Sequence, residues 1–425
     1  MYNKVRNIYI SNRKHLFVLV ALLPGLLIAC ANNNSLIGTL TITEPIGSTR
    51  NLEYVEVEIP VDQLPSQDKA LFLKSKNGER IKGQILQRKK ESSGYTISCL
   101  FPINIQAHKK VKYDMIMAED KVISTDLKVE GEGLELMIEN NYYVANLTSK
   151  MATVKNEIGA GQLVSLTLKS FGNQMLKRAN INMHWAPSFQ KKGLDYKTMA
   201  HLRKYDSVFI DKGLHQSTIY RSGKVEGYEE IQLKGQYQFY AGLPYFIFSS
   251  SIIMEDNVLL TMLRNDEMTM DSLFTHAMFP LPNGEIKKAS LYDKPPLSSH
   301  YSIKELRKTP INANAKWFCF YNDSLKYGFG SIRIHYDYTN ADGAQSPMLN
   351  PETRISYARA EGRYWDRRFL FSETDSLIIP KGSRYTEKNA YVIFKINPEN
   401  PAKEMEELYI KLTQPVLVKY DNYIK

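Results

Sequence analysis

Short runs in which apolar and polar residues alternate recur along almost the whole chain, and this period of two is what most constrains the fold. The runs are rich in Val, Ile, Tyr and Phe and are bounded by Gly, Pro, Asn or Asp. They cover residues 54–59, 95–101, 111–117, 163–169, 231–240, 245–253, 332–338 and 390–396. Side chains alternate between the two faces of a β-strand, so this pattern predicts half-buried strands. Amphipathic segments of helical period are scarce, and the one at 403–411 is too short to change the class. The chain is therefore predicted to be all-β.

The strand-like runs fall into two groups along the chain. Residues 37–125 carry four or five of them and end near a charged segment at 118–121, which predicts a small N-terminal β-sandwich. The longer runs from 126 to 425 predict one large antiparallel assembly of stacked sheets. Residues 281–314 contain four prolines and little periodicity. A loop this long in a compact domain is often a lid or a cleft wall.

The first thirty residues predict export and lipid attachment. Four cations without an acidic residue precede an apolar run at 16–29, which is too short to span a bilayer but suits a secretory signal. The run ends in Leu-Ile-Ala-Cys, which resembles a bacterial lipobox with Cys30 as the lipid-attachment residue. We therefore expect a signal peptide at 1–29, a tether at 30–36 and a lipid anchor in the outer membrane or periplasm. The alternative is an ordinary signal with a chance cysteine.

Charge and cysteine content narrow the class of partner. The formal net charge is +10, and removal of residues 1–29 leaves about +6, spread along the chain rather than blocked. This distribution predicts no nucleic-acid partner. It would suit an anionic glycan, although a solvated basic surface explains it more simply. Cys99 and Cys319 lie within apolar-aromatic runs and are predicted to be buried thiols, not a disulfide or a metal site.

No strong catalytic motif occurs. The chain has no Gly-rich phosphate loop, paired-His zinc spacing, nucleophile elbow or dinucleotide fingerprint, so no cofactor is predicted, while a metal ion stays an open alternative. Polar and aromatic clusters stand at the ends of predicted strands instead. They occupy residues 182–187, 240–245, 263–267 with His276 beyond, 333–338 and 361–368.

Each cluster also has a structural explanation. A single His in a strand is more often structural or exposed than catalytic. The segment 240–245 can be a simple hairpin connection, and 361–368 can be a surface ladder of cross-strand pairs. Their shared content of His, Tyr, Arg and Trp nevertheless favours binding of an anionic sugar. Aromatic rings stack on sugar rings, and Arg forms bidentate hydrogen bonds with carboxylate or sulfate.

Two stretches resemble known carbohydrate-active proteins. The segments Leu-Thr-Ile-Thr-Glu-Pro-Ile-Gly-Ser-Thr-Arg at 40–50 and Val-Glu-Val-Glu-Ile-Pro at 55–60 resemble lipoproteins with a domain of unknown function that are encoded in polysaccharide-utilisation loci of Bacteroidota. Residues 238–245 through 263–266 are similar to the β-supersandwich of galactose-mutarotase-like and rhamnogalacturonan-lyase-like proteins. This resemblance implies lyase or oligosaccharide dehydratase chemistry on uronate-containing oligosaccharides, sulfated or unsulfated, such as ulvan or pectin fragments.

Elimination from a uronate requires three tasks, each of which suits particular residue types. The substrate carboxylate must be neutralised, a base must remove the C5 proton, and an acid must protonate the departing oxygen. Glycosidase chemistry would need two opposed carboxylates, and Glu229, Glu230, Asp266 and Glu267 show no telling arrangement. The rival class is a non-catalytic glycan-binding lipoprotein. The candidate acids and bases are His184, His276, His335 and Tyr245, the carboxylate-binding residues are Arg264 and Arg363, the sugar platform is Trp185 and Trp365, and the further substrate contacts are Arg333 and Tyr364.

Overall fold

Strands dominate the protein, as the sequence predicts. The structure, a computed structural model, describes residues 35–148, 151–152, 157–177, 183–270, 273–292, 311–312, 314–357, 362–372 and 374–423. Within these ranges there is one α-helix, α2 (Lys403–Thr413), and no helix that is long and apolar enough to cross a membrane. The all-β prediction is confirmed. Cys30 and the signal segment lie outside the described residues, as does most of the predicted loop after residue 292.

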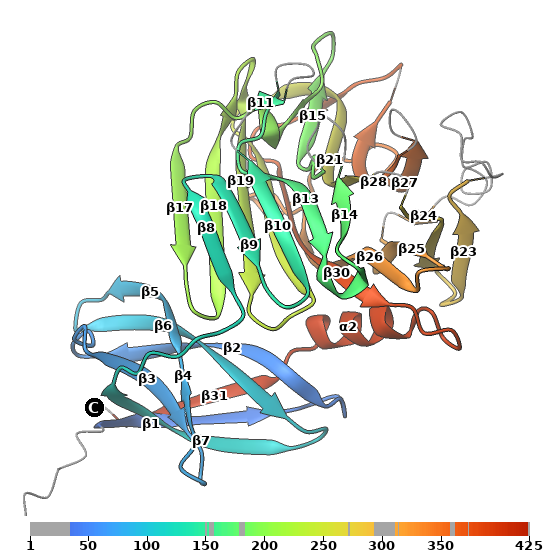
Figure 1. Ribbon diagram of the computed structural model, residues 1–425. Helices are drawn as coiled ribbons and strands as arrows, with labels where there is room; N and C mark the ends of the chain where they lie inside the picture. The colour runs from blue at the N-terminus through green and yellow to red at the C-terminus, as the bar shows by residue number, and fades with distance from the viewer. Residues whose placement is uncertain are drawn as a thin grey trace, which may run out of the picture.

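The N-terminal part is a sandwich of two sheets (Figure 1). One sheet has the order β31-β1-β7-β3-β4 and the other β2-β6-β5, and the apolar residues of their facing sides form one core. The last strand of the chain, β31, lies within the range predicted for the large assembly but pairs with β1 here. The strands are β1 Ser35–Thr43, β2 Arg50–Val61, β3 Lys69–Lys74, β4 Arg80–Lys82, β5 Gln84–Lys90, β6 Tyr95–Ile105, β7 Lys110–Glu119 and β31 Leu417–Asn422.

A nine-stranded antiparallel sheet forms the centre of the large assembly. Its order is β17-β18-β19-β20-β30-β26-β25-β22-β23. Most of its strands carry apolar residues on both faces, and the buried Cys319 lies on one of them. The prediction of two buried free thiols, Cys99 and Cys319, is thus confirmed. The strands are β17 Ser207–Lys212, β18 Gln216–Val225, β19 Tyr228–Tyr240, β20 Tyr245–Met254, β22 His276–Pro280, β23 Ile286–Ser290, β25 Trp317–Asn322, β26 Tyr327–Asp337 and β30 Arg384–Lys395.

Two smaller sheets share a core with one face of the nine-stranded sheet. A five-stranded sheet runs β14-β13-β10-β9-β8, and a seven-stranded sheet runs β16-β15-β21-β28-β27-β24 with β29 paired to β21. Ile138, Phe248 and Trp365, one from each sheet, belong to the same apolar cluster. The strands are β8 Lys128–Glu132, β9 Glu135–Glu139, β10 Tyr143–Thr148, β13 Gln162–Leu168, β14 Gln174–Lys177, β15 Ser188–Lys191, β16 Lys197–Thr198, β21 Val258–Met270, β24 Ile311–Asn312, β27 Glu352–Tyr357, β28 Arg363–Phe371 and β29 Leu377–Ile379. A short pair, β11 Met151–Ala152 and β12 Glu157–Ile158, and two 3₁₀ turns, η1 Lys169–Phe171 and η2 Met199–His201, complete the described elements.

The opposite face of the nine-stranded sheet is covered by α2 and by the N-terminal sandwich. Met405 of α2 belongs to the apolar cluster that contains Trp317 and Phe394 of the sheet. The sandwich is fixed to the sheet's loops by polar contacts as well: Tyr54 Oη donates to the carbonyl of Ala241 (2.9 Å). The stacked sheets therefore form one assembly with the sandwich docked beneath it (Figure 1).

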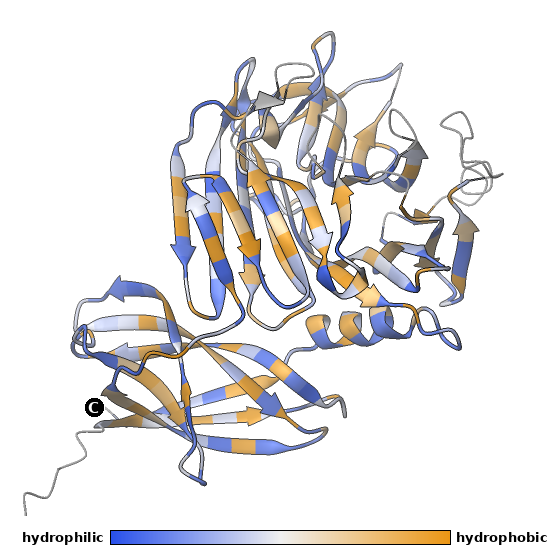
Figure 2. Ribbon diagram, viewed as in Figure 1, coloured by the Kyte–Doolittle hydropathy of each residue, from blue (hydrophilic) through white to orange (hydrophobic). Residues whose placement is uncertain are grey.

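Alternation along single strands decides what each face of a sheet carries. Figure 2 shows hydrophobic and hydrophilic residues alternating along the strands of both parts of the molecule. On β21 and β28 this alternation places Asp266 and Trp365 between the sheets, while their neighbours Glu267 and Asp366 face the other side. Because β21 and β28 are paired, the outward residues of both strands form one surface, and this surface is the candidate functional site.

Candidate functional site

The outward face of β21, β28 and β15, with the segments that flank β15, carries a dense group of ionisable and aromatic side chains, which we call the Glu267 cluster. Strand pairing brings its members together: Glu267 lies opposite Asp366, and Arg264 lies opposite both Arg368 and Ser188. Register shifts on either side of Arg264 bring a second residue of β21 onto this face. The members are Trp185, Ser188, Tyr196, Arg264, Glu267, Tyr364, Asp366 and Arg368.

Two arginines and two carboxylates form the centre of the cluster. Arg264 Nη1 lies 3.0 Å from Glu267 Oε1 and 3.3 Å from Asp366 Oδ2, so it bridges the two acids. Arg368 binds Asp366 through Nε and Nη2 at 2.7 and 2.8 Å. Asp366 is fully buried, whereas Arg264 and Glu267 keep 8% and 6% of their surface exposed. Asp366 is therefore held in place as a structural anion, and Glu267 is the carboxylate that solvent can reach.

The second oxygen of Glu267 accepts hydrogen bonds from two hydroxyls. Tyr196 Oη and Ser188 Oγ lie 3.0 and 3.2 Å from Oε2. Burial raises the pKa of Glu267, and the nearby Asp366 adds to this, although Arg264 lowers it. Burial also raises the pKa of Tyr196 and of Tyr364, so both phenols keep their protons. The cluster thus combines a carboxylate that accepts a proton more readily than an ordinary Glu with two phenolic proton donors.

Several N–H groups of the cluster are buried without a hydrogen-bond partner. They are Trp185 Nε1, Arg264 Nε and Arg368 Nη1, each unpaired within the described part of the chain. The Trp185 ring lies 6.3 Å from that of Tyr196, and the Arg264 guanidinium lies 5.6 Å from the Tyr196 ring. An unpaired buried donor is costly unless a ligand or water satisfies it. These N–H groups leave the cluster with unused capacity to donate hydrogen bonds.

The opposite face of the same strands carries a different polar network. Asp266 accepts from Trp365 Nε1 (3.1 Å), Tyr391 Oη (3.0 Å) and Ser331 Oγ (2.7 Å). His184 Nδ1 contacts Tyr237 Oη at 2.5 Å. All these side chains lie between the sheets and are buried, and burial, reinforced by the nearby cation Arg221, lowers the pKa of His184 to about 3.

This burial corrects three of the roles predicted from the sequence. His184 and Trp365 are 0% exposed, so neither reaches a sugar: the histidine belongs to the interior network and the indole to the core. Arg363 is also buried and holds the chain locally, because its Nε donates to the carbonyl of Leu291 (2.9 Å) and its guanidinium stacks 4.0 Å from the Tyr292 ring.

A bulge in β26 separates residues that strict alternation would place on one face. Arg333, His335 and Asp337 would share a face, but the pairing register with β30 shifts between Arg333 and His335. Arg333 therefore stacks on Tyr336 and lies 3.9 Å from the buried Glu387, while His335 is exposed on the other side. The structure thus places Arg333 beside Glu387 on the nine-stranded sheet rather than at a sugar-binding surface.

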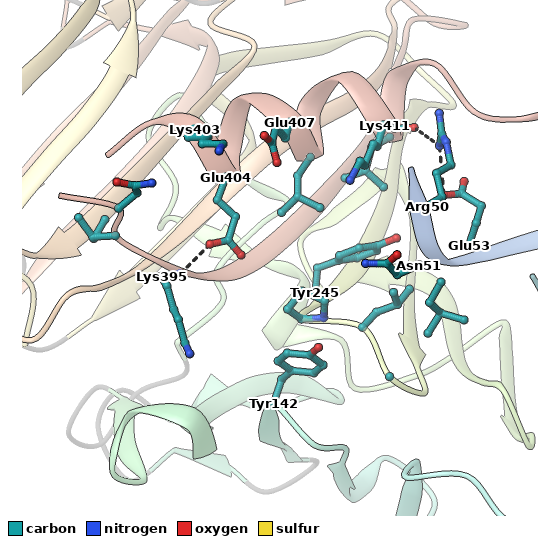
Figure 3. Close-up of a pocket in the computed structure, with 18 of the residues that line it drawn as sticks. Arg50, Asn51, Glu53, Tyr142, Tyr245, Lys395, Lys403, Glu404, Glu407 and Lys411 are labelled. Atoms are coloured by element: carbon teal, nitrogen blue, oxygen red, sulfur yellow. Dashed lines mark hydrogen bonds and ion pairs between the residues drawn. The ribbon is translucent and has the colours of Figure 1, made fainter. Parts of the chain in front are cut away.

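The remaining predicted acids and bases lie elsewhere. His276 stacks on Tyr321 and contacts Thr275 Oγ1 at 2.8 Å. Tyr245 lines a cavity of about 940 Å³ between β2, the hairpin of β9 and β10, the turn after β19, the end of β30 and helix α2, which we call the interdomain cavity (Figure 3). No contact between described residues joins His276, His335 or Tyr245 to the Glu267 cluster. Of the predicted residues, the cluster brings together Arg264, Trp185 and Tyr364.

The sequence pattern does not point to Tyr196 or to the roles of Glu267, Asp366 and Arg368. The last three stand inside the polar and aromatic clusters at 263–267 and 361–368, where the pattern indicates strands but not which face points outward. Tyr196 follows a loop with no motif. Within the described ranges there is no group of three His, Cys, Asp or Glu side chains that could hold a metal ion.

Comparisons with known proteins bear on the fold. No protein-family model matches the sequence, and no curated protein matches it. Among solved structures, an alpha-mannosidase from Enterococcus faecalis V583 superposes with a TM-score of 0.52 and 9% identity, over 91% of this chain and 46% of that one. A protein of glycosyl hydrolase family 38 from Enterococcus faecalis gives 0.50 and 10%, over 91% and 47%. The chain therefore spans about half the length of these structures.

Identity this low shows a shared fold only. The expected likeness to carbohydrate-active β-sandwich proteins is confirmed at that level. The link to polysaccharide-utilisation loci stays a prediction.

Proposed function

We propose that this protein is a carbohydrate-active enzyme that eliminates across C4 and C5 of a uronate in an oligosaccharide, with the Glu267 cluster as its site. The observation that carries the proposal is one juxtaposition: a reachable carboxylate of raised pKa lies between a partly exposed arginine and a tyrosine hydroxyl. Its fold is one that glycoside-processing proteins also use.

Each part of the reaction has a residue in this arrangement. Arg264, which keeps 8% of its surface exposed, would bind the substrate carboxylate and stabilise the charge that develops on it, while Arg368 would hold Asp366 in place. Glu267 would take the C5 proton, the electrons of that bond would form the C4–C5 double bond, and the C4–O bond would break. Tyr364, whose pKa is raised, would protonate the departing oxygen. Trp185 would provide the apolar surface for the sugar ring.

Elimination suits this geometry better than glycoside hydrolysis. Hydrolysis needs two carboxylates on opposite sides of the scissile bond. Here Glu267 and Asp366 stand on paired positions of neighbouring strands, share Arg264 as a partner, and Asp366 is fully buried. One working carboxylate with phenols and arginines is the set that an elimination requires.

Purified protein incubated with uronate oligosaccharides tests the proposal. We expect the absorbance of an unsaturated uronate to appear, and mass spectrometry to separate chain cleavage by a lyase from loss of water by a dehydratase. Glu267→Gln should lower turnover by roughly 10²–10⁴, while Glu226→Gln, at an exposed glutamate on the loop after β18, should leave it unchanged. Wild-type turnover in Glu267→Gln would reject this site.

A glycan-binding protein without catalysis is the second candidate. The aromatic pair of Trp185 and Tyr196 beside unpaired N–H donors favours it, because stacking and hydrogen bonding alone are enough for recognition. Wild-type protein that binds the uronate oligosaccharide but forms no unsaturated product would decide for this class.

A further inference from the structure

The interdomain cavity is lined from both parts of the molecule and lies away from the Glu267 cluster. Tyr142, from the turn between β9 and β10, and Tyr245, at the start of β20, face helix α2 across it, and Asn51 of β2 lies beside them (Figure 3). Both tyrosines are half-buried. Its volume of about 940 Å³ lies at the upper end of the range for ligand sites, which often form between domains.

Hydrogen bonds fix the walls of this cavity to one another. Arg50 of β2 donates to the carbonyls of Lys411 (3.1 Å) and Gln414 (2.5 Å) at the end of α2. Asn140 Nδ2 donates to the carbonyls of Tyr240 and Leu243, both at 2.9 Å, which joins the β9–β10 hairpin to the turn after β19. The start of α2 is tied to β30, because Glu404 Oε2 accepts from the backbone N–H of Lys395 (3.0 Å). The cavity is thus preformed, which lowers the entropic cost of binding.

The polar groups that line the cavity are balanced in charge. Four cationic and four anionic side chains contribute to its walls. Among the described residues, no hydrogen bond engages the side chains of Lys403, Glu407 or Lys411, or the hydroxyls of Tyr142 and Tyr245. A polyanion would meet Glu404 and Glu407, whereas sugar hydroxyls can donate to carboxylates and accept from ammonium groups. Tyrosine rings offer faces for the apolar side of a sugar ring.

We propose that the interdomain cavity binds a neutral oligosaccharide, at a site separate from the Glu267 cluster. The two sites would then bind different parts of a glycan: the Glu267 cluster would bind the acidic sugar, and the interdomain cavity would bind an uncharged stretch. This inference does not depend on any elimination reaction.

Calorimetric titration of the whole protein with cellotetraose, mannotetraose, xylotetraose and tetragalacturonate tests the proposal. We expect at least one neutral tetrasaccharide to bind and Tyr142→Ala to weaken its binding by about tenfold or more, which corresponds to the loss of a stacking contact. Tyr142→Phe keeps the ring and should bind within about threefold of wild type. Tyr423→Ala removes an exposed tyrosine of the N-terminal sandwich outside the cavity and should have no effect.

Glu267→Gln keeps the two proposals distinguishable, because it should leave the neutral ligand's affinity unchanged whether or not it abolishes elimination. If Tyr142→Ala does not fold, Glu407→Ala, at an exposed position of α2, tests the opposite wall and should also weaken binding. The proposal is overturned if no neutral tetrasaccharide binds, if both cavity variants bind like wild type, or if tetragalacturonate displaces the neutral ligand.

Discussion

Asp266 and Glu267 are consecutive carboxylates on one strand, yet the two faces of the sheet give them different environments. Asp266 lies between the sheets at 0% exposure and is surrounded by Trp365, Tyr391, Ser331 and Arg367. Glu267 lies on the outward face, where its partners are Arg264, Tyr196 and Ser188 and solvent reaches part of it. The same chemical group therefore stabilises the core on one face and is available to a ligand on the other.

Access to solvent, rather than the satisfaction of hydrogen bonds, separates the two acids. The partners of Asp266 are all buried, and some of their polar atoms are unpaired: Arg367 Nε and Nη2 have no hydrogen-bond partner within the described chain. Three N–H donors of the Glu267 cluster are likewise unpaired, but there the carboxylate keeps 6% of its surface exposed. Unpaired donors next to a carboxylate of raised pKa are typical of sites that bind a ligand. The comparison predicts that substitutions on the inner face lower the free energy of unfolding, whereas substitutions on the outer face impair ligand binding or turnover.

The largest effect on stability is expected from Asp266→Ala. This change removes the acceptor of three hydrogen bonds and leaves Arg367, whose Nε lies 3.4 Å from Asp266 Oδ2, without its buried counter-ion. Loss of one member of a buried ion pair costs about 3–5 kcal/mol of unfolding free energy. Urea denaturation followed by circular dichroism measures it. Asp266→Asn is the matched control: it keeps one acceptor oxygen for Trp365 and Tyr391 and should lose less. An Asp266→Ala protein as stable as wild type would contradict a structural role for the inner face.

A smaller effect concerns pH and His184. The pKa of His184 is about 3 in the folded protein, against 6.5 for an unperturbed histidine. Between these two pH values the histidine is protonated in the unfolded chain but stays neutral in the folded chain. Unfolding free energy should therefore fall as the pH falls from 6.5 toward 3, by about 2 kcal/mol between pH 7 and pH 5.

His184→Gln removes this titration and should flatten that dependence. Glu387 acts in the opposite direction, since its pKa is raised to about 7 by burial and its protonated form favours the folded state. Because Glu387 is present in both proteins, the difference between their pH curves reports His184 alone. Parallel curves for wild type and His184→Gln would show that the histidine is not held neutral.

Sequence periodicity predicted the fold class well, because alternation is a local property of each strand. The runs at 54–59, 231–240 and 245–253 are strands of the structure. Pairing between strands that are distant in the sequence is not a local property. The alternation of apolar and polar residues therefore does not predict that β31 pairs with β1. A single-residue bulge has the same consequence on a smaller scale. The shift after Arg333 moves it to the opposite face from His335, which strict alternation cannot foresee.

The site was predictable in part for a related reason. The segments 263–267 and 361–368 stood out by their charge, and both supply the Glu267 cluster. Within these segments the residue types do not reveal which face of the strand points outward. They favour Trp365 and Arg363, which lie outside the cluster, over Asp366 and Arg368, which pair with its members on β21. Tyr196 reaches Glu267 only through the tertiary structure.

The smallest change in stability, and the sharpest test of the comparison, is expected from Glu267→Gln. Glutamine keeps the size of the side chain and an acceptor oxygen for Tyr196, Ser188 or Arg264, and it removes a charge whose burial is unfavourable, as the raised pKa of Glu267 records. The unfolding free energy should change by less than about 1 kcal/mol, because Arg264 keeps Asp366 as its counter-ion and no buried charge is left uncompensated. Measured under the same urea conditions, Asp266→Ala and Glu267→Gln should thus differ by several-fold in stability, although the residues are adjacent. A loss of about 3 kcal/mol or more in Glu267→Gln would show that the outer cluster supports the fold in the same way as the inner network, and the reason for placing a ligand site there would be lost.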